Sequence, residues 1–419
     1  MQTVIGIDDT DSRERGMCTT YAARLVAHRI RERGHRVDEL RLVRLNPAVE
    51  HKTRGNAALA IHTDAPEDVA LAAATGVVRD HAETADGRTN PGVVVAGDLD
   101  ESVVAFARNA TTEFHDIADA ERIVERMGYL SEGWGVGRGK IGALAAVGAH
   151  EAFEDWTYEY IAYREPDRWG TPREVDPDSL FAAADAAYPA AWDTVDRGEG
   201  APVCVPNAPG PILYGIRGDD PVAVAGVAAA VDSEPVHDRA LFVTNQGTDV
   251  HVQRGSIGSL DDGGAYRLSG TVVESPETRP GGHVFFALGE GDDRLECVAF
   301  EPTKRFRDRV RDLRAGDRVT VVGEVTDGTL KLEKFAVRDL VETTTTTPTC
   351  PDCDAAMKSA GADQGYRCRD CGTSAPGKVS VPIDRDLEPG WYEVPPVARR
   401  HVAKPLVRGG FDAPTHPER

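Results

Sequence analysis

Short apolar runs and helix-period segments alternate along the first 150 residues. Within residues 21–33, apolar side chains recur three to four positions apart, which predicts a helix with one apolar face. Similar segments predict helices over residues 66–84, 101–109 and 118–127. Apolar runs predict strands over residues 4–7, 41–45, 57–61 and 93–95. Strands that alternate with helices indicate an α/β domain over residues 1–150.

The next segment, residues 151–263, is richer in Trp, Tyr and Pro and less regular in its pattern. Helices are predicted over residues 177–187 and 221–231, and strands over residues 212–216 and 239–243. This mixture favours an α+β domain of the ferredoxin-like type.

Residues 264–342 carry the clearest pattern in the chain. Five strands are predicted, with one helix at residues 304–313 between the third and the fourth. The strands cover residues 266–273, 283–288, 294–300, 317–325 and 330–340. This arrangement is typical of an OB-fold barrel, which binds oligonucleotides through one face and two loops. A different small barrel without a ligand is the alternative.

A Thr-rich stretch at residues 342–348 is predicted to be a linker, and four cysteines follow it. Cys350, Cys353, Cys368 and Cys371 have the spacing C-x2-C-x14-C-x2-C. Four thiolates in this pattern can surround one Zn²⁺ in a closed structural site, so residues 348–378 are predicted to form a zinc ribbon. A redox or iron centre is the alternative. A segment this small would need the metal in order to fold.

Residues 379–419 are predicted to form a basic C-terminal tail. Between residues 394 and 408 the chain has four full positive charges and no negative one, at Arg399, Arg400, Lys404 and Arg408. Basic side chains close to Trp391 suit phosphates and stacked bases, which predicts RNA binding. A solvated tail without a ligand is the alternative.

Composition changes how these patterns are interpreted. The 419 residues have a formal net charge of -21, and only eight of the 48 basic residues are lysines. An acidic, Lys-poor chain suggests a halophile with a salt-rich cytoplasm. At molar salt the Debye length is ~3 Å, so the net charge does not exclude RNA binding. No apolar stretch approaches ~18 residues and no secretory signal is visible, which predicts a cytoplasmic protein.

The first predicted strand leads directly into an acidic, hydroxyl-rich segment. Asp8, Asp9 and Asp11 follow the strand, and Cys18-Thr19-Thr20 precede the first helix. Ligands bind outside the carboxyl ends of strands in open α/β sheets, and crowded carboxylates suit Mg²⁺. Thr19 or Thr20, at the start of a helix, could accept a phosphoryl group. A capped turn is the alternative.

Two basic, glycine-containing loops complete the predicted phosphate site. Residues 137–142 match G-x-G-x-x-G, but no strand is predicted before them and the loop is not a Walker A motif. Backbone amides there could approach an anion, and a flexible hinge is the alternative. The second loop covers residues 51–56. Its cationic side chains could clamp phosphates and its amide side chain could bind a base or ribose, and an ordinary polar turn is the alternative. The predicted ATP- and phosphate-binding residues are Gly137, Arg138, Gly139, Lys140, Lys52, Arg54 and Asn56.

Several motifs together resemble a known family. They are IGIDDTDS with GMCTTY, KTRGNAA, the glycine loop before IGALAA, LYGIRG, TNQGTD, the four-cysteine ribbon and ARRHVAKPLVR. Over essentially its whole length the chain resembles the archaeal tRNA(Ile) 2-agmatinylcytidine synthetases. The resemblance implies a multidomain α+β protein with a kinase-like domain, a ferredoxin-like domain, an OB fold and a zinc ribbon, in that order.

The resemblance also implies an activity. The family ligates agmatine to carbon 2 of the wobble cytidine in the CAU anticodon of an isoleucine tRNA, with ATP, so that AUA is read as isoleucine. The carbon-2 oxygen is activated by phosphorylation. In this chain the resemblance implies that Asp8, Asp9 and Asp11 hold Mg²⁺, that Thr19 becomes phosphorylated, and that the glycine loop holds phosphates.

The agmatine site is the least defined part of the prediction. A guanidinium requires a carboxylate or carbonyl cage, for which Asp249 is the candidate, with Tyr214 and Arg217 beside it. Two other functions remain open from the residues alone. One is an OB-fold and zinc-ribbon protein that binds single-stranded nucleic acid without ligase activity, and the other is a metal-dependent phosphoesterase that needs no ATP.

Overall fold

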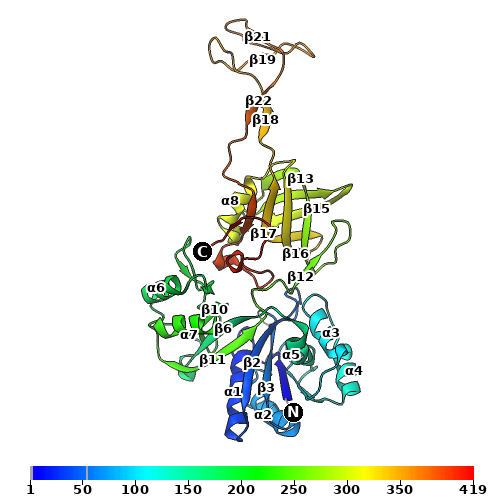
Figure 1. Cartoon of the computed structure of the whole chain (residues 1–419), viewed down its shortest axis with the longest axis vertical. Helices are drawn as coiled ribbons and strands as arrows, with labels where there is room; N and C mark the ends of the chain where they lie inside the picture. Colours follow the sequence, from blue (N-terminus) through cyan, green and yellow to red (C-terminus); the bar gives the residue numbers. More distant parts are fainter. Residues whose placement is uncertain (1–2, 53–54) are drawn as a thin grey trace.

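The computed structural model of the chain describes residues 3–52 and 55–419 (Figure 1). A nine-stranded sheet in the order β5-β4-β1-β3-β2-β11-β6-β10-β7 runs through both N-terminal segments. Its strands are β1 (Thr3–Asp8), β2 (Val37–Arg44), β3 (Ala57–Thr63), β4 (Gly92–Ala96), β5 (Leu130–Gly133), β6 (Thr157–Arg164), β7 (Ala191–Trp192), β10 (Ile212–Gly218) and β11 (Val236–Thr244). The two predicted N-terminal domains therefore share one sheet.

The strands of this sheet are mostly antiparallel, unlike those of a parallel α/β sheet. Every neighbouring pair is antiparallel except β2 and β11, which join the two halves in parallel through Arg41↔Val243 and Leu42↔Thr244. Because β1 is antiparallel to β3 and β4, its carboxyl end lies beside the beginnings of those two strands. The residues that follow β1 therefore meet Asn56, before β3, and Asn90, before β4.

Helices cover both faces of the sheet. They are α1 (Thr19–Glu32), α2 (Glu67–His81), α3 (Glu101–Asn109), α4 (Ile117–Met127), α5 (Gly139–Ala152), α6 (Pro177–Ala187) and α7 (Pro221–Ala230). One buried cluster packs α1 and α2 against β1–β4, and a second packs α3 and α5 against the opposite face of the same strands. The predicted helices at residues 101–109 and 177–187 have the bounds of α3 and α6. The sequence did not predict β6 or the short β5, and it indicated only the apolar centre of α5.

Glycines let α5 lie unusually close to the strands. A Cβ on Gly6 of β1 would lie 2.0 Å from the carbonyl oxygen of Ala143, and a Cβ on Gly92 would lie 2.0 Å from the amide nitrogen of Lys140. The amino end of α5 therefore starts directly above the carboxyl end of β1. A helix amino terminus carries a partial positive charge, which favours anions at that position.

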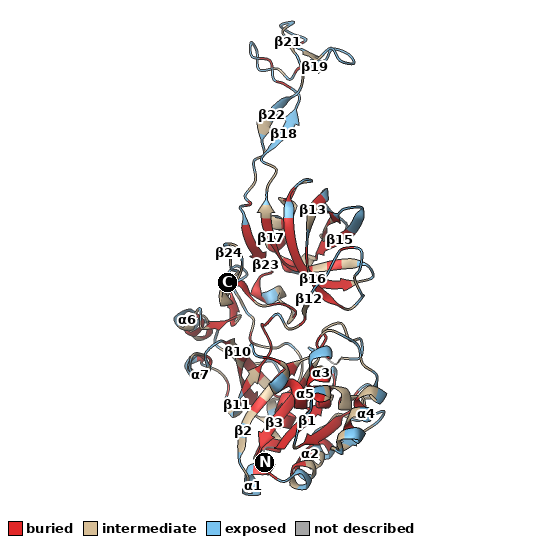
Figure 2. Ribbon diagram, turned by 45° about the vertical axis from the view of Figure 1, so that its right-hand side comes forward, coloured by how far each residue is buried: buried red, intermediate tan, exposed pale blue. Residues whose placement is uncertain are grey.

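A closed five-stranded barrel follows, as predicted. β13 (Ala265–Thr278), β14 (Val284–Glu290), β15 (Asp293–Ala299), β17 (Thr329–Asp339) and β16 (Arg318–Thr326) pair in that order, and β16 returns to β13. α8 (Phe306–Arg311) lies between β15 and β16 in sequence. The core of the barrel is a separate buried cluster (Figure 2). β12 (Val252–Arg254) adds to the barrel beside β13.

A two-stranded stalk carries the ribbon away from the barrel (Figure 1). β18 (Thr343–Thr346) pairs with β22 (Val379–Pro382), so the Thr-rich stretch forms a strand where the sequence predicted a linker. Threonine is β-branched and favours extended structure. Beyond the stalk, β19 (Lys358–Ser359), β20 (Tyr366–Arg367) and β21 (Ser374–Ala375) form a small sheet.

The C-terminal segment returns to the barrel and is not an extended tail. β23 (Gly390–Glu393) pairs with β17, and β24 (Thr415–His416) pairs with β23. Trp391 and Leu406 of this segment are buried against Val322 and Ala336 of the barrel. The coil after β23, drawn in red, lies between the barrel and the nine-stranded sheet (Figure 1). Among the described residues, no helix is both long enough and apolar enough to cross a membrane.

Candidate active site

A cavity of about 840 Å³ opens where β1 ends and β3 begins. Its wall combines residues from both halves of the sheet and from the C-terminal segment. The wall includes Asp8, Asp9, Asp11, Cys18, Thr19, Thr20, Arg44, Lys52, Asn56, Arg138, Gly139, Glu159, Arg173 and His401. A volume of this size is typical of cavities that bind small molecules and cofactors.

The three aspartates predicted for Mg²⁺ all line the cavity. Burial and the neighbouring Asp9 carboxylate hold the pKa of Asp8 well above its usual value. Burial, with a contribution from Asp11, raises the pKa of Asp9 to about 6, although its Oδ2 accepts a hydrogen bond from the Asn90 amide at 2.9 Å. These carboxylates are close together and partly desolvated, so a cation or a cationic ligand would stabilise their charged forms.

Gly142 explains how Asp8 fits against α5. A Cβ at that position would lie 2.0 Å from the Asp8 Oδ2 atom, so only glycine leaves room for the carboxylate. The three aspartates do not, however, form a complete metal cage. In residues 3–52 and 55–419, the one group of three or more metal-ligating side chains whose ligand atoms lie within 4.8 Å of one another is the cysteine cluster. Mg²⁺ commonly takes one or two carboxylates and completes its shell with phosphates and water, which this arrangement suits.

The amino end of α1 places two hydroxyls in the same wall. Thr19 is buried, and its Oγ1 accepts a hydrogen bond from the Thr10 hydroxyl at 3.1 Å. Thr20 is also buried, and its hydroxyl lies 3.0 Å from the Cys18 thiol. Each hydroxyl is therefore held in position beside the aspartates.

The glycine loop contributes less than predicted. Arg138 and Gly139 line the cavity, but Gly137 and Lys140 do not. The Lys140 ammonium instead pairs with Glu121 of α4 at 2.9 Å. The amides of Gly137, Gly139 and Lys140 already donate to the carbonyls of Trp134, Asn90 and Gly137. The loop is therefore not an open cradle of amides, and Arg138 is its main contribution to the cavity.

In the second predicted loop, two of the three residues lie in the cavity wall. Burial is the main reason why the pKa of Lys52 is lowered. Asn56 has φ 44° and its side-chain amide donates to the Asn46 carbonyl at 2.7 Å, which holds the turn before β3. Arg54 lies outside the described residues.

The three residues predicted for agmatine are not in the cavity wall. Asp249 accepts hydrogen bonds from the Lys334 ammonium at 3.2 Å and from the Lys404 amide at 2.8 Å. The Tyr214 hydroxyl donates to the Ala228 carbonyl at 3.0 Å within the core of the second half. Arg217 pairs with Glu159 at 3.4 Å. The geometry therefore does not favour this set as a ligand site.

Several polar wall residues were not identified from the sequence, and four of them come from distant parts of the chain. Arg44 ends β2, Glu159 lies on β6, Arg173 follows β6, and His401 comes from the C-terminal segment. Only Glu159 left a usable signal, because strand alternation puts it on the same face as the apolar Ile161. The others come together through pairings between distant parts of the chain.

Most of the predicted tRNA-binding residues are engaged within the protein. Arg399 is buried in ion pairs with Asp193 and Glu393. Arg408 pairs with Asp155 at 2.9 Å and with Asp219 at 2.6 Å. Arg400 pairs with Glu324 and Glu333 of the barrel but stays 40% exposed. The Lys404 ammonium lies over the Phe411 ring.

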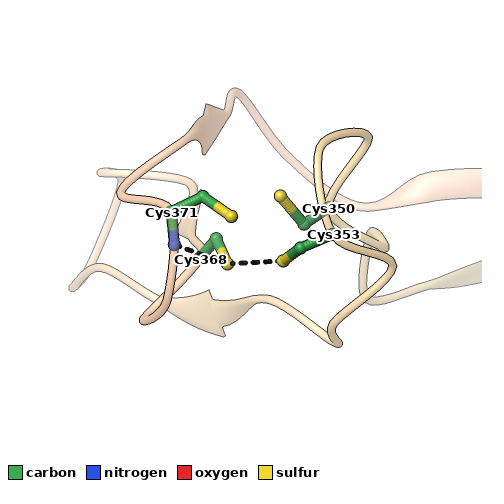
Figure 3. Close-up of side chains that lie close together, drawn as sticks. All are labelled: Cys350, Cys353, Cys368 and Cys371. Carbon is green, nitrogen blue, oxygen red and sulfur yellow. Dashed lines mark hydrogen bonds between the residues drawn. The ribbon is translucent and has the colours of Figure 1, made fainter.

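The cysteine cluster has the geometry of a tetrahedral zinc site (Figure 3). The Sγ atoms of Cys353 and Cys368 lie 3.6 Å apart. Zn–S bonds of about 2.3 Å in a tetrahedron would place sulfurs ~3.8 Å apart. The Cys371 amide donates to the Cys368 sulfur at 3.4 Å and lowers the pKa of that thiol to about 7. The residues present therefore fit zinc.

Comparisons with known proteins agree along the chain. Family profiles match residues 4–66 (TiaS TCKD domain), 137–251 (TiaS FLD domain) and 347–387 (TiaS C-terminal zinc ribbon domain). The tRNA(Ile) 2-agmatinylcytidine synthetase TiaS of Haloquadratum walsbyi is 54% identical, and the alignment covers 100% of both chains.

Solved structures show the same fold over the same length. A complex of TiaS with an isoleucine tRNA and ATP has a TM-score of 0.91 at 41% identity. A complex of TiaS with an isoleucine tRNA, AMPCPP and agmatine has a TM-score of 0.88 at 39% identity. Each covers 100% of this chain and of the solved chain. The chain belongs to the tRNA(Ile) 2-agmatinylcytidine synthetase (TiaS) family.

Proposed function

We propose that this protein uses ATP to ligate agmatine to carbon 2 of the wobble cytidine in the CAU anticodon of isoleucine tRNA. The observation that carries the proposal is the 54% identity, over the full length of both chains, with a named 2-agmatinylcytidine synthetase. Complexes of relatives with an isoleucine tRNA, ATP and agmatine support the same substrates here. A carbon–nitrogen ligase also accounts for the partly buried aspartates, which a passive single-strand-binding protein would not need.

The cavity wall supports a phosphoryl-transfer step. Phosphoryl transfer depends mainly on positioning and on neutralising charge. We assign Asp8, Asp9 and Asp11 to holding Mg²⁺ against the triphosphate, with Arg138, Lys52 and the amino end of α5 contributing positive charge. Mg²⁺, when bound, supplies the charge that lets these carboxylates face phosphates. Of the two threonines in the wall, we assign Thr19 as the hydroxyl that accepts a phosphoryl group, because the family resemblance singles it out.

The domain assignments follow from the same function. We propose residues 1–150 as the kinase-like unit and residues 151–263 as a ferredoxin-like unit. The strand order β11-β6-β10-β7, with α6 and α7 packed in one cluster beside it, supports the second assignment. We propose that the barrel, residues 264–342, acts as an OB fold that holds RNA together with the zinc ribbon. Agmatine is proposed to enter the main cavity, where Glu50, Glu113 and Asp116 supply carboxylates.

Mass spectrometry of the wobble base tests the proposal directly. The protein is incubated in molar KCl with ATP, Mg²⁺, agmatine and a CAU-anticodon isoleucine tRNA transcript. We expect one agmatine adduct on the wobble cytidine, which depends on ATP. Asp9→Asn should abolish the adduct, whereas Asp100→Asn, at the exposed cap of α3, should retain it. An unmodified wobble cytidine with the wild-type protein would overturn the proposal.

A further inference from the structure

Glu159 is a buried carboxylate that the proposed phosphoryl transfer does not use. It lies near the amino end of β6, lines the main cavity, and is 5% exposed. One of its oxygens, Oε1, lies 3.4 Å from the Arg217 Nε atom. The other, Oε2, is buried and has no hydrogen-bond partner among the described residues. Burying an unpaired carboxylate oxygen is costly, so a donor from a ligand is the natural partner.

The charges around Glu159 decide what kind of donor fits. Arg217 already supplies one compensating cation. Arg44 also lines the cavity, and its largest charge interaction is with Glu159. In the part of the chain that the structure describes, Arg44 has no carboxylate within ion-pair distance. Two guanidiniums and one carboxylate leave this corner net positive, which disfavours a cationic ligand such as agmatine and favours a neutral N–H donor.

We propose that Glu159 recognises the target base by accepting a hydrogen bond from the exocyclic 4-amino group of cytosine. This inference rests on the proposed function, since it requires a cytidine to enter the cavity. Enzymes that modify a base commonly extrude it and read its Watson–Crick edge by hydrogen bonds. Carboxylates are suited to accept from the cytosine 4-amino group. Arg44 can donate to the acceptor atoms on the same edge.

The same arrangement would reject uridine. Uracil presents a carbonyl oxygen where cytosine presents the amino group, so it would face the Glu159 carboxylate with a second acceptor. The carbon-2 oxygen, at which the reaction is proposed, is common to both bases. Discrimination between cytosine and uracil must therefore come from position 4, at the opposite end of the Watson–Crick edge. A site built to hydrogen-bond a donor rejects an analogue that lacks the donor.

Changing the wobble base of the tRNA in combination with a substitution of Glu159 tests the inference. Three tRNA transcripts are compared, with cytidine, uridine or a cytidine analogue without the 4-amino group at the wobble position. We expect the wild-type protein to prefer cytidine over the other two by at least about 10- to 100-fold in kcat/KM for tRNA. Glu159→Gln presents both a donor and an acceptor. It should therefore reduce the preference for cytidine over uridine, and over the analogue, by about 10-fold or more each.

A matched control and a second readout separate the possible roles. Glu165→Gln makes the same change just beyond the end of β6, outside the cavity, and should leave both ratios unchanged. The KM for agmatine should change less than two-fold in Glu159→Gln. A raised agmatine KM with unchanged base ratios would overturn the proposal and assign Glu159 to agmatine, and unchanged ratios with unchanged KM would assign it a structural role.

The proposal stays testable if Glu159→Gln folds poorly. The transcript without the 4-amino group probes the wild-type protein alone, and equal modification of that transcript and the cytidine transcript would contradict the role of Glu159. If the wild-type protein modifies the cytidine transcript and the transcript without the 4-amino group equally well, the role of Glu159 is contradicted but the proposed function stands. A wild-type protein that modifies none of the transcripts contradicts the proposed function itself.

Discussion

At the scale of single residues, the titration of Asp9 makes the stability of the folded protein depend on pH. Its pKa in the folded protein is about 6, against 3.8 as the reference value. A carboxyl group with a raised folded-state pKa contributes stability that is present below pH 4 and is lost as the pH rises through 6. Asp9→Asn removes this dependence, and its side-chain oxygen can still accept the Asn90 hydrogen bond.

We therefore expect the ligand-free Asp9→Asn protein to be more stable than wild type above pH 6, by about 1–3 kcal/mol, and equally stable near pH 4. Denaturant unfolding at constant KCl across this range measures the difference. Added Mg²⁺ should raise the unfolding midpoint of the wild type at pH 7.5 more than that of the variant. A wild type that is the more stable of the two at pH 7.5 would show that burial and the neighbouring Asp11 do not destabilise the charged Asp9 carboxylate.

Thr19 and Thr20 provide a second residue-scale prediction. Both are buried hydroxyls in the same wall, but their hydrogen-bond partners differ, Thr10 for Thr19 and Cys18 for Thr20. With γ-labelled ATP, Thr19→Ala should lose at least about 90% of the protein-bound phosphoryl label, whereas Thr20→Ala should keep it. Phosphopeptide mapping identifies the labelled residue. Label that persists in Thr19→Ala would place the acceptor elsewhere.

The residue scale also shows where sequence reasoning stopped. The aspartates and threonines were predictable because they are neighbours in sequence and lie next to a strand end. Glu159, Arg44 and His401 reach the same cavity from β6, β2 and the C-terminal segment, so their proximity depends on tertiary pairing. Lys140 lies outside the cavity wall for a related reason, since the Glu121 carboxylate that pairs with its ammonium comes from α4.

At the scale of elements, the ribbon is independent of the rest of the chain. Its small core, Cys350, Met357 and Cys368, shares no residue with the core of the barrel. Cys371→Ser should reduce bound zinc from one ion per chain to nearly none and unfold the ribbon, because a unit this small depends on its metal. The main thermal transition should shift by less than ~2 °C, since in the part of the chain that the structure describes only the stalk joins the ribbon to the barrel (Figure 1).

Elemental analysis and calorimetry together check the ribbon prediction. Ser374→Ala changes an exposed residue of β21 and should keep the zinc. A large fall of the main transition in Cys371→Ser would show that the ribbon packs on the barrel.

Elements with strong local patterns were the ones that could be predicted. The barrel strands alternate clearly, and α3 and α6 have regular apolar faces and acidic caps. β6 was missed because its run of Tyr, Glu and Ala alternates only weakly in hydropathy. The Thr-rich stretch was predicted to be a linker from composition alone, and its pairing with residues 379–382 depends on the ribbon closing the loop between them.

At the scale of the whole molecule, the C-terminal segment joins the barrel to the nine-stranded sheet. Its apolar residues pack on the barrel, while the Arg408 guanidinium bonds to Asp155, Asp219 and the Gly247 carbonyl of the sheet half. His401 of the same segment lines the cavity. This placement brings one segment into contact with the barrel, the sheet half and the cavity wall, which a free basic tail would not do.

Arg408→Ala tests whether this segment acts as a connection or as an RNA contact. The Arg408 guanidinium is itself buried, but its partners Asp155 and Asp219 are partly exposed, so the loss of these hydrogen bonds should cost about 1 kcal/mol. We expect a lower unfolding midpoint without tRNA and at least about a 10-fold fall in tRNA modification, while phosphoryl labelling of Thr19 changes less than two-fold. Arg36→Ala removes an exposed ion pair with Asp38 at the end of β2 opposite to the cavity and should leave all three unchanged. If Arg408 instead contacts phosphates, its loss would raise the KM for tRNA without lowering the unfolding midpoint. Salt should screen the pairs with the partly exposed carboxylates but not the hydrogen bond to the Gly247 carbonyl, so part of the stability difference should persist in molar KCl.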